Sequence, residues 1–354
     1  MEDVEIDGHS LTIEGAISVA NGDNTAVLAK SARRRMEQSR KGVEQIIDSG
    51  EVVYGINTGF GAMSSVRIAG EDLEQLQTNL IKSHACAVGD LMNPEHVLLM
   101  MIFRANSLAK GVSGIRPKVV ELLLGMVNKG IAPVIPRIGS LGASGDLAPL
   151  SHMSLAILGE GESMVRKGSG WVTMSSLDAL HSVGLEPTEL AAKEGLSLIN
   201  GTSQMCAYLA LTILNLEKLV FAADSSAATS LEAIKGSHSP FDPRIHDNRP
   251  QIGQSISAAR IAGLLKGSEI KISHVDCDRV QDAYCFRCAP QVHGPVIDLL
   301  TETRRMLEIE INSATDNPLV FVDGEDVDVI SGGNFHGQNL ALASDSIAIA
   351  CHEL

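Results

Sequence analysis

The tripeptide Ala143-Ser144-Gly145 can undergo chemistry on its own backbone. The Gly145 amide nitrogen can attack the Ala143 carbonyl carbon, because glycine lacks the side chain that would stop the backbone from folding back so tightly. Loss of two waters, one of which takes the Ser144 hydroxyl, would leave a 4-methylidene-imidazol-5-one (MIO). This ring is an electrophile that no encoded side chain offers. A lone Ala-Ser-Gly is more typical of an ordinary turn, so the surrounding residues must decide.

The flanking residues favour this chemistry. A glycine-spaced loop covers residues 138–142, and Asp146 follows the tripeptide as a candidate helix N-cap. Pro149 would lie in the first turn of a helix whose apolar run extends to Leu158. The positive end of that helix dipole would lie next to the ring and hold negative charge. The sequence therefore predicts an electrophile at a helix N-terminus.

The composition indicates a mainly α fold that can position such a group. Hydrophobic residues make up 44% of the 354 residues and aromatic residues only 3%, a balance that suits closely packed helices. We predict a long-helix bundle with a smaller N-terminal α-rich domain at residues 1–195 and the central bundle at 196–354. Helices are expected at 26–47, 71–86, 94–108, 117–128, 146–158, 201 onward, 256–265, 291–311 and 337 to the end, with hairpins at 4–13, 165–174 and 319–330 and a loop at 238–254.

Charge and hydropathy exclude several classes of partner. The net charge is -15 and no Lys/Arg-rich patch stands out, which argues against nucleic acid and an anionic membrane surface as partners. The N-terminus shows no secretory signal, and we expect no stretch long enough to span a bilayer. The six cysteines indicate reduced thiols. The sequence thus predicts a cytoplasmic protein without membrane or nucleic-acid partners.

Six motifs together resemble the MIO-dependent aromatic amino acid ammonia-lyases and aminomutases, in that family's order. The resemblance runs from about residue 50 to the end and is closest to the histidine ammonia-lyases. It implies a homotetramer whose active sites combine residues from several chains, with no diffusible cofactor. The motifs are Gly139-Ser-Leu-Gly-Ala-Ser-Gly-Asp-Leu-Ala-Pro-Leu-Ser-His152, Tyr54-Gly-Ile-Asn-Thr-Gly-Phe-Gly61, Leu198-Ile-Asn-Gly-Thr202, Val280-Gln-Asp-Ala-Tyr-Cys-Phe-Arg-Cys-Ala-Pro-Gln291, Asp316-Asn-Pro318 and Ser331-Gly-Gly-Asn-Phe-His-Gly337.

The resemblance also implies catalytic roles for two tyrosines and an arginine. Tyr54 matches the family's catalytic tyrosine, and a phenol acts as a base at neutral pH only with positive charge or donors nearby. Arg287 matches the arginine that binds the substrate carboxylate, which a guanidinium grips with two parallel hydrogen bonds. Tyr284, three residues earlier, would share its face of a helix and could relay protons.

Other matched residues would surround the ring or the substrate. Asn200 and Gln281 match amides that hydrogen-bond the ring or the substrate. Phe335 matches an aromatic residue that packs against the MIO. For Asn200 and Gln281 the alternative interpretation is a buried amide whose hydrogen bonds only join loops. For Phe335 it is simple core packing.

The pair Ser83-His84 indicates the substrate. In the family this position resembles a selectivity switch, at which Ser-His suits an imidazole, Phe-Leu suits phenylalanine and His-Leu suits tyrosine. A histidine can hydrogen-bond an imidazole nitrogen that an apolar residue would leave unpaired. We therefore expect an enzyme that converts L-histidine to urocanate and ammonia. A phenylalanine or tyrosine ammonia-lyase, an aminomutase and a non-catalytic helical homologue are the alternatives.

One further pattern, a set of His and Cys residues, is an alternative to this interpretation. His274-x-x-Cys277 and Cys285-x-x-Cys288 have spacing typical of zinc ligands. However, Tyr284 and Arg287 interleave with the second pair, so we predict buried free thiols and no metal. The chain also ends in helical pattern without a Gly or Asn cap, so we expect it to be cut inside an element. The resemblance implies that the missing part would carry a glutamate near the substrate and much of the tetramer contact surface.

Overall fold

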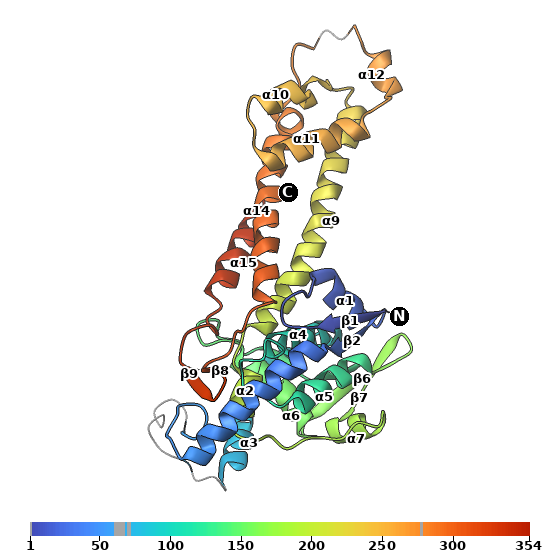
Figure 1. Ribbon diagram of the computed structural model, residues 1–354. Coiled ribbons are helices and arrows are strands. Elements are labelled where there is room, and N and C mark those ends of the chain that lie inside the picture. Colours follow the sequence, from blue (N-terminus) through green and yellow to red (C-terminus); the bar gives the residue numbers. More distant parts are fainter. Residues whose placement is uncertain (1, 60–67, 69–71, 277–278) are drawn as a thin grey trace. The chain divides into compact units, whose positions relative to one another are not determined.

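The computed structural model describes residues 2–59, 68, 72–276 and 279–354 (Figure 1). Helices dominate these residues, and the strands pair in small sheets of two or three strands. The fold is thus mainly α, as predicted. The chain divides into two compact units, one formed by the residues up to Tyr208 with Leu307–Gln338 and the other by Leu209–Met306 with Asn339–Leu354. The domain boundary predicted between residues 195 and 196 remains a prediction.

The first unit contains most of the shorter elements. Its order along the chain is β1 (Asp3–Ile6), α1 (Ile13–Asn21), β2 (Thr25–Leu28), α2 (Lys30–Ser49), α3 (Leu73–His84), β3 (Val88–Leu91), α4 (Pro94–Leu108), α5 (Pro117–Asn128), β4 (Ile131–Pro133), β5 (Pro136–Ile138), α6 (Leu147–Ile157), β6 (Glu162–Lys167), β7 (Gly170–Ser175), α7 (Ser176–His181), α8 (Glu194–Ile199), the start of α9 (Ser203–Ala233), β8 (Leu319–Asp323) and β9 (Asp326–Ile330).

Helix α4 is the centre of this unit. Every residue from 97 to 108 is buried, and the helix contacts α1, α5 and β4. Its start follows from local chemistry, since the Asn93 side chain accepts a hydrogen bond from the Glu95 amide and Pro94 occupies the first turn. Both α4 and α5 begin and end at the predicted residues. An all-round apolar helix of this kind belongs in a core.

The hairpin predicted at 4–13 is wrong. Strand β1 instead pairs in parallel with β2, and α1 lies between them along the chain. The Asp7 carboxylate accepts from the His9 and Ser10 amides, which closes a local turn, and Thr12 caps α1 at its N-terminus. The helix predicted at 26–47 likewise starts only at residue 30, because residues 25–28 form β2.

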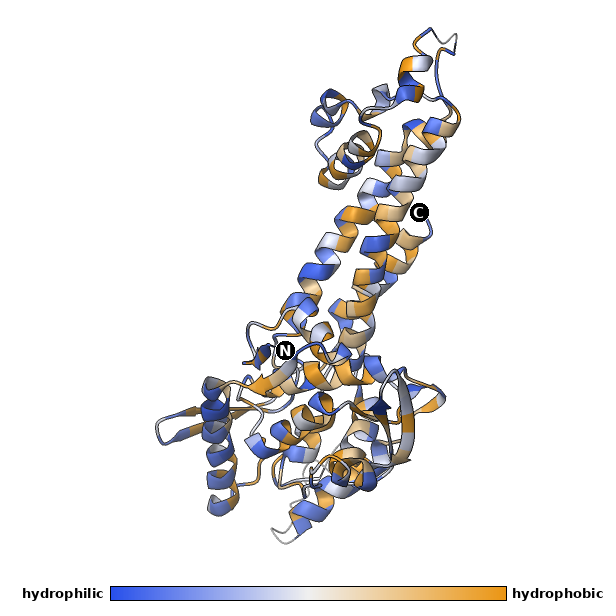
Figure 2. Cartoon of the chain, turned by 90° about the vertical axis from the view of Figure 1, so that its right-hand side faces the viewer, coloured by the Kyte–Doolittle hydropathy of each residue, from blue (hydrophilic) through white to orange (hydrophobic). Residues whose placement is uncertain are grey.

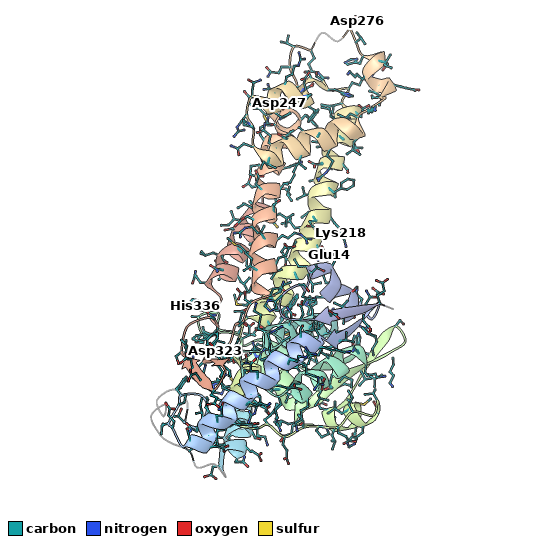
Figure 3. All side chains as sticks on the ribbon, viewed as in Figure 1. Glu14, Lys218, Asp247, Asp276, Asp323 and His336 are labelled. Atoms are coloured by element: carbon teal, nitrogen blue, oxygen red, sulfur yellow. The ribbon has the colours of Figure 1, made fainter. Side chains whose placement is uncertain are left out.

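The other two predicted hairpins are confirmed. Strands β6 and β7 pair antiparallel from Glu162↔Ser175 to Lys167↔Gly170. Strands β8 and β9 pair from Leu319↔Ile330 to Asp323↔Asp326, and Gly324 at their turn has a φ of 62°. Figure 3 labels Asp323 at this turn and His336 in the segment after β9.

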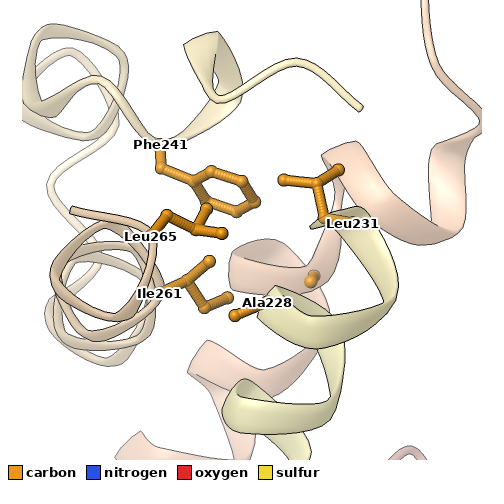
Figure 4. Packing of buried hydrophobic residues seen from close by; sticks show 6 residues of the cluster. Ala228, Leu231, Phe241, Ile261 and Leu265 are labelled. Atoms are coloured by element: carbon orange, nitrogen blue, oxygen red, sulfur yellow. The ribbon is translucent and has the colours of Figure 1, made fainter. Parts of the chain in front are cut away.

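The second unit is built around the remainder of α9. Buried Ala228 and Leu231 of α9 pack with Phe241, Ile261 and Leu265 in one apolar cluster (Figure 4). The loop predicted at 238–254 contains two short helices, and the next helix starts at residue 252 rather than 256. The elements are η3 (Ser239–Phe241), α10 (Pro243–Asp247), α11 (Ile252–Leu264), α12 (Glu269–Ser273), α13 (Tyr284–Arg287), α14 (Ala289–Glu310) and α15 (Gln338–Cys351).

The long helix α9 carries the predicted buried stripe, but it is not buried all round. Leu209, Ile213, Leu216 and Val220 are at most 3% exposed, whereas Phe221 is 53% exposed. Hydrophobic residues are frequent along α9, whereas α2 is mostly hydrophilic. Figure 2 shows helices of both kinds. By length and composition alone, the helical run Glu194–Ala233 could cross a membrane, which contradicts the expectation that no stretch is long enough.

Candidate active site

The Ala143-Ser144-Gly145 segment forms a tight turn whose backbone is held by its own neighbours. The Ser144 amide donates to the Leu141 carbonyl at 2.7 Å, and Leu141 and Gly145 form an isolated antiparallel bridge. Gly145 has a φ of 82°, a left-handed value that favours glycine. A β-carbon there would lie 2.8 Å from the Gly201 carbonyl oxygen, so the turn has no room for one. The backbone therefore makes a tight turn across the residues that would form the ring.

Two later segments of the first unit pack against this turn. The Asp146 amide donates to the Gly201 carbonyl at 2.7 Å, and the Gly337 amide donates to the Gly142 carbonyl at 2.8 Å. Half-buried Phe335 belongs to the second segment, and its carbonyl oxygen would lie 3.2 Å from a β-carbon at Gly145. The structure thus brings the segment of Phe335 and the neighbour of Asn200 to the predicted electrophile.

Asp146 stands at the predicted N-cap position of α6, but its side chain makes no bond to α6. Its fully buried carboxylate instead accepts from the Gln204 and Met205 amides at 2.6 and 3.1 Å, at the first turn of α9, and from the Ser140 hydroxyl at 2.5 Å. The predicted cap is wrong because α9 offers unsatisfied amides from across the unit. Burial raises the pKa of Asp146 to about 6 against these hydrogen bonds.

Asn200 lies at the end of α8 and is 6% exposed. Its Nδ2 donates to the Asn317 carbonyl at 3.0 Å and to the Asp316 carboxylate at 3.4 Å. Asp316 in turn forms a 2.7 Å ion pair with Lys193, and both side chains are fully buried. The motif Asp316-Asn-Pro318 thus meets the motif of Asn200, although the sequence assigned Asp316 no role.

Buried Arg104 completes a cluster of four charges around Asn200 and Gly201. It donates to the Ser197 carbonyl and to the Thr315 hydroxyl. Burial lowers the pKa of Arg104 to about 10, against the opposing charges of Asp316 and Asp146. The two cations and two anions of this cluster balance, as buried charges must. A lone arginine within the apolar pattern of α4 was the signal in the sequence that could have found it.

A further carboxylate holds the next residue of the same segment. The Thr202 hydroxyl donates to Glu310 at 2.7 Å, and burial raises the pKa of Glu310. Three carboxylates, those of Asp316, Glu310 and Asp146, therefore accept hydrogen bonds from residues between 200 and 205. Sequence reasoning missed Glu310, because nothing local marks it as the partner of a residue 108 positions earlier.

Tyr54 lies in a shaped loop, as predicted, although Phe60 and Gly61 of its motif lie outside the described residues. The Asn57 side chain bridges this loop, because it accepts from the Val53 amide and donates to the Glu51 carbonyl. Gly55 has a φ of 78°, and a β-carbon there would lie 2.7 Å from Pro318. Half-buried Tyr54 thus sits beside the segment that holds Asn200.

Ser83 and His84 form the last turn of α3, which packs against α6 and α8. The Ser83 hydroxyl donates to the Leu80 carbonyl at 2.8 Å, and His84 Nδ1 lies 2.9 Å from the same oxygen. With the proton on Nδ1, the Nε2 of His84 can accept a hydrogen bond. The pair therefore forms the polar end of a helix that packs against both α6, which follows the turn, and α8, which precedes Asn200.

Gln281, Tyr284 and Arg287 belong to the second unit. The Arg287 guanidinium lies over the Tyr284 ring, 4.6 Å from its centroid, so the two side chains share a face as predicted. With its amide turned to satisfy both groups, the Gln281 oxygen accepts from the Arg287 Nη2 at 2.6 Å. This group is preassembled within its own unit. Tyr284 is 75% exposed.

The cysteines do not match the predicted buried thiols. Cys285 is exposed and Cys288 is partly exposed. Cys277 of the zinc-like pattern lies outside the described residues. Within the described part of the chain, no group of three or more His, Cys, Asp or Glu side chains could hold a metal ion.

Comparisons with known proteins agree with these motifs. The family model for aromatic amino acid lyases matches residues 11–354. The histidine ammonia-lyase of Caldanaerobacter subterraneus subsp. tengcongensis is 48% identical over all 354 residues, which span 68% of that relative. The crystal structure of histidine ammonia-lyase from Trypanosoma cruzi superposes with a TM-score of 0.88 at 40% identity. The match covers 100% of this chain and 65% of the Trypanosoma cruzi chain.

A tyrosine aminomutase from Streptomyces globisporus is also similar, with a TM-score of 0.88 at 38% identity. The match covers 98% of this chain and 68% of the aminomutase chain. The chain therefore spans about two thirds of the length of these relatives. The matched region includes every motif described above. The chain belongs to the aromatic amino acid lyase family, and so to the carbon–nitrogen lyases.

Proposed function

We propose that the whole protein eliminates ammonia from L-histidine to give urocanate. The observation that carries this proposal is the conformation of the Ala143-Ser144-Gly145 turn, closed on itself and packed against the Asn200 and Phe335 segments. The histidine assignment rests on Ser83-His84 and on relatives named histidine ammonia-lyase. A tyrosine aminomutase has a similar fold, so tyrosine chemistry is the second candidate.

The residues present fit an MIO ring. Gly145 already has the left-handed φ and lacks room for a side chain, and the Ser144 amide is bonded within the same turn. Ala143, Ser144 and Gly145 would supply the ring, and Asn200 and Phe335 would border it. When formed, the MIO supplies an electrophile that carries the amino group as a better leaving group.

The reaction also needs groups that the chain supplies directly. A base must take a proton from the β-carbon of the substrate. The electron pair of the broken C–H bond then forms the Cα–Cβ double bond, and the electron pair of the Cα–N bond leaves with the nitrogen. We assign the base to the Tyr54 phenolic oxygen and a proton relay to Tyr284. Arg287 would hold the substrate carboxylate, with Gln281 orienting its guanidinium, and His84 would hydrogen-bond the substrate imidazole.

We further propose that the protein is a cytoplasmic homotetramer with shared active sites. The second unit exposes large apolar side chains, among them Phe221 at 53%, Leu342 at 58% and Ile349 at 72% exposure. Exposed large apolar side chains of this kind support an interface with other chains if they form one patch in the assembly. Sedimentation of the whole protein should therefore give the mass of four chains, and a monomer would contradict this part of the proposal.

One experiment tests the function. The whole protein is incubated separately with L-histidine, L-phenylalanine and L-tyrosine, and product absorbance is followed while intact mass is measured. We expect urocanate from L-histidine and a mass two waters below that of the sequence. Ser144→Ala is the matched control, and it can lose at most one water. An unmodified wild-type mass would refute the electrophile, and turnover of tyrosine alone would favour the second candidate.

A further inference from the structure

The side-chain amide of Asn200 is oriented by its surroundings. Both groups that it contacts, the Asn317 carbonyl and the Asp316 carboxylate, are acceptors. Only the NH2 end of an amide can donate to them, so this end must point toward residues 316–317. No described residue donates to the Asn200 oxygen. That oxygen is therefore left available on the other side of the amide.

Asp316 is itself held in place by a lysine. Lys193 Nζ lies 2.7 Å from Asp316 Oδ2 and also donates to the Ser197 hydroxyl at 3.0 Å. Asp316 Oδ1, the oxygen nearer Asn200, accepts from the Asn317 amide at 2.7 Å. Each carboxylate oxygen thus has a fixed partner. The acceptor that Asn200 meets cannot rotate away without breaking one of these bonds.

The backbone conformation of Lys193 and the burial of its ion pair with Asp316 both destabilise the folded state. Lys193 has a φ of 74°, a left-handed conformation that is unfavourable for a residue with a side chain. Taking two charges fully out of water is also unfavourable, and apolar residues of similar volume are often as stable. Stability alone therefore does not account for a buried pair at a strained position directly behind Asn200.

We propose that Lys193 and Asp316 are positioning residues, which lock the Asn200 amide so that its oxygen faces the substrate amino group beside the Ala143-Ser144-Gly145 turn. The inference rests on the proposed function. Gly201, the neighbour of Asn200, links the two sites, because its carbonyl accepts from the Asp146 amide. A shift of Asn200 would therefore occur next to the turn itself. In this reading Lys193 acts on Asp316, Asp316 acts on Asn200, and Asn200 alone touches substrate.

A double-mutant cycle in the whole protein tests this order of action. Two charge-free pairs are compared, Lys193→Met with Asp316→Asn and Lys193→Met with Asp316→Leu. Both remove the ion pair, so neither leaves an unpaired buried charge, and the leucine has nearly the shape of aspartate. The asparagine keeps an oxygen that can accept from Asn200, whereas the leucine does not. Each pair is made with Asn200 intact and with Asn200→Ala.

With Asn200 intact, the leucine pair should show a kcat/KM for L-histidine about 10- to 100-fold below that of the asparagine pair, because the Asn200 amide then loses the Asp316 acceptor and keeps only the Asn317 carbonyl. With Asn200→Ala, the two pairs should differ by less than about twofold, because the residue through which Asp316 acts is gone. Intact mass should show the same loss of two waters in all four proteins. Trp171 fluorescence checks that the first unit is folded.

An equal loss in both Asn200 backgrounds would overturn the inference, because it would show that Asp316 acts on the fold in general. Equal kcat/KM for the two pairs with Asn200 intact would overturn it as well. Either result leaves the proposed function standing, since the wild type is still active. A wild type that turns over none of the three amino acids would instead refute the proposed function, and the inference with it.

Discussion

Replacing Asp146 with asparagine should change how the stability of the first unit depends on pH. The wild-type carboxylate is fully buried against the first turn of α9, and its pKa is raised from 3.8 to about 6, chiefly by burial. A raised carboxyl pKa means that the folded state binds the proton more tightly than the unfolded state. The contribution of Asp146 is therefore greatest below pH 3.8 and is lost as the pH rises through about 6.

The size of the effect follows from the same values. A shift of about two units corresponds to about 3 kcal/mol between the two protonation states. The neutral asparagine has no such dependence, yet its oxygen can still accept from the Gln204 amide. We expect the free energy of unfolding of wild type, minus that of Asp146→Asn, to rise by about 2–3 kcal/mol between pH 7 and pH 4.

Urea unfolding followed by fluorescence measures this difference. The chain has one tryptophan, Trp171, and it lies on β7 in the first unit, so its signal reports on that unit. Lys193→Met with Asp316→Asn, which leaves no unpaired buried charge, is the control with the opposite sign. Burial would raise the pKa of Asp316, but the charges of Lys193 and Arg104 outweigh it and lower that pKa, so its contribution is lost as the pH falls below about 4. A difference for Asp146→Asn that is flat, or that falls toward acid, would refute the reasoning.

Three further predictions concern the site itself. Gly145→Ala should lower the free energy of unfolding by about 2–5 kcal/mol in a urea titration. A left-handed alanine contributes about 1–2 kcal/mol of this loss, and overpacking against Gly201 contributes about 1–3 kcal/mol. The control Gly168→Ala, also left-handed but in open space, should show only the first contribution. In the whole protein, Tyr54→Phe should lower kcat strongly at unchanged thermal stability, whereas Arg287→Lys should mainly raise KM; near-normal turnover by Tyr54→Phe would place the base elsewhere. His84→Leu with Ser83→Phe should lower kcat/KM for L-histidine about 10- to 150-fold and gain relative preference for L-phenylalanine, and a wild type that prefers phenylalanine would refute the histidine assignment.

The elements that local sequence determines were predicted well. Helices α4 and α5 each begin with a proline that a first helical turn tolerates and carry a continuous apolar pattern, so both ends could be read from the residues. The β8–β9 hairpin followed from alternation around Asp323-Gly324. The parallel pairing of β1 with β2 could not be read, because the strands are joined through α1 and each shows only four residues of pattern.

The candidate site shows the same difference between residues in local motifs, which were predicted, and their distant partners, which were not. Ala143-Ser144-Gly145, Asn200 and Phe335 lie in recognisable motifs, and the structure places their segments together. The groups that hold them were missed, since the pairing of Lys193 with Asp316 joins residues 123 positions apart. Asp146 shows the limit most clearly. Its position before α6 suggested a local cap, but the backbone amides that donate to its carboxylate belong to α9.

The origin of the contacts around the turn also bears on the synthesis of the chain. The Gly142 carbonyl, next to the ring-forming residues, receives its hydrogen bond from the Gly337 amide near the end of the first unit. When the ribosome has just released the turn, it has not yet synthesised this partner. Contacts between residues so far apart form late, because the chain between them must first be ordered. Cyclisation of Ala143-Ser144-Gly145 would then report that the first unit is complete, and nascent chains stopped before residue 335 should retain both waters.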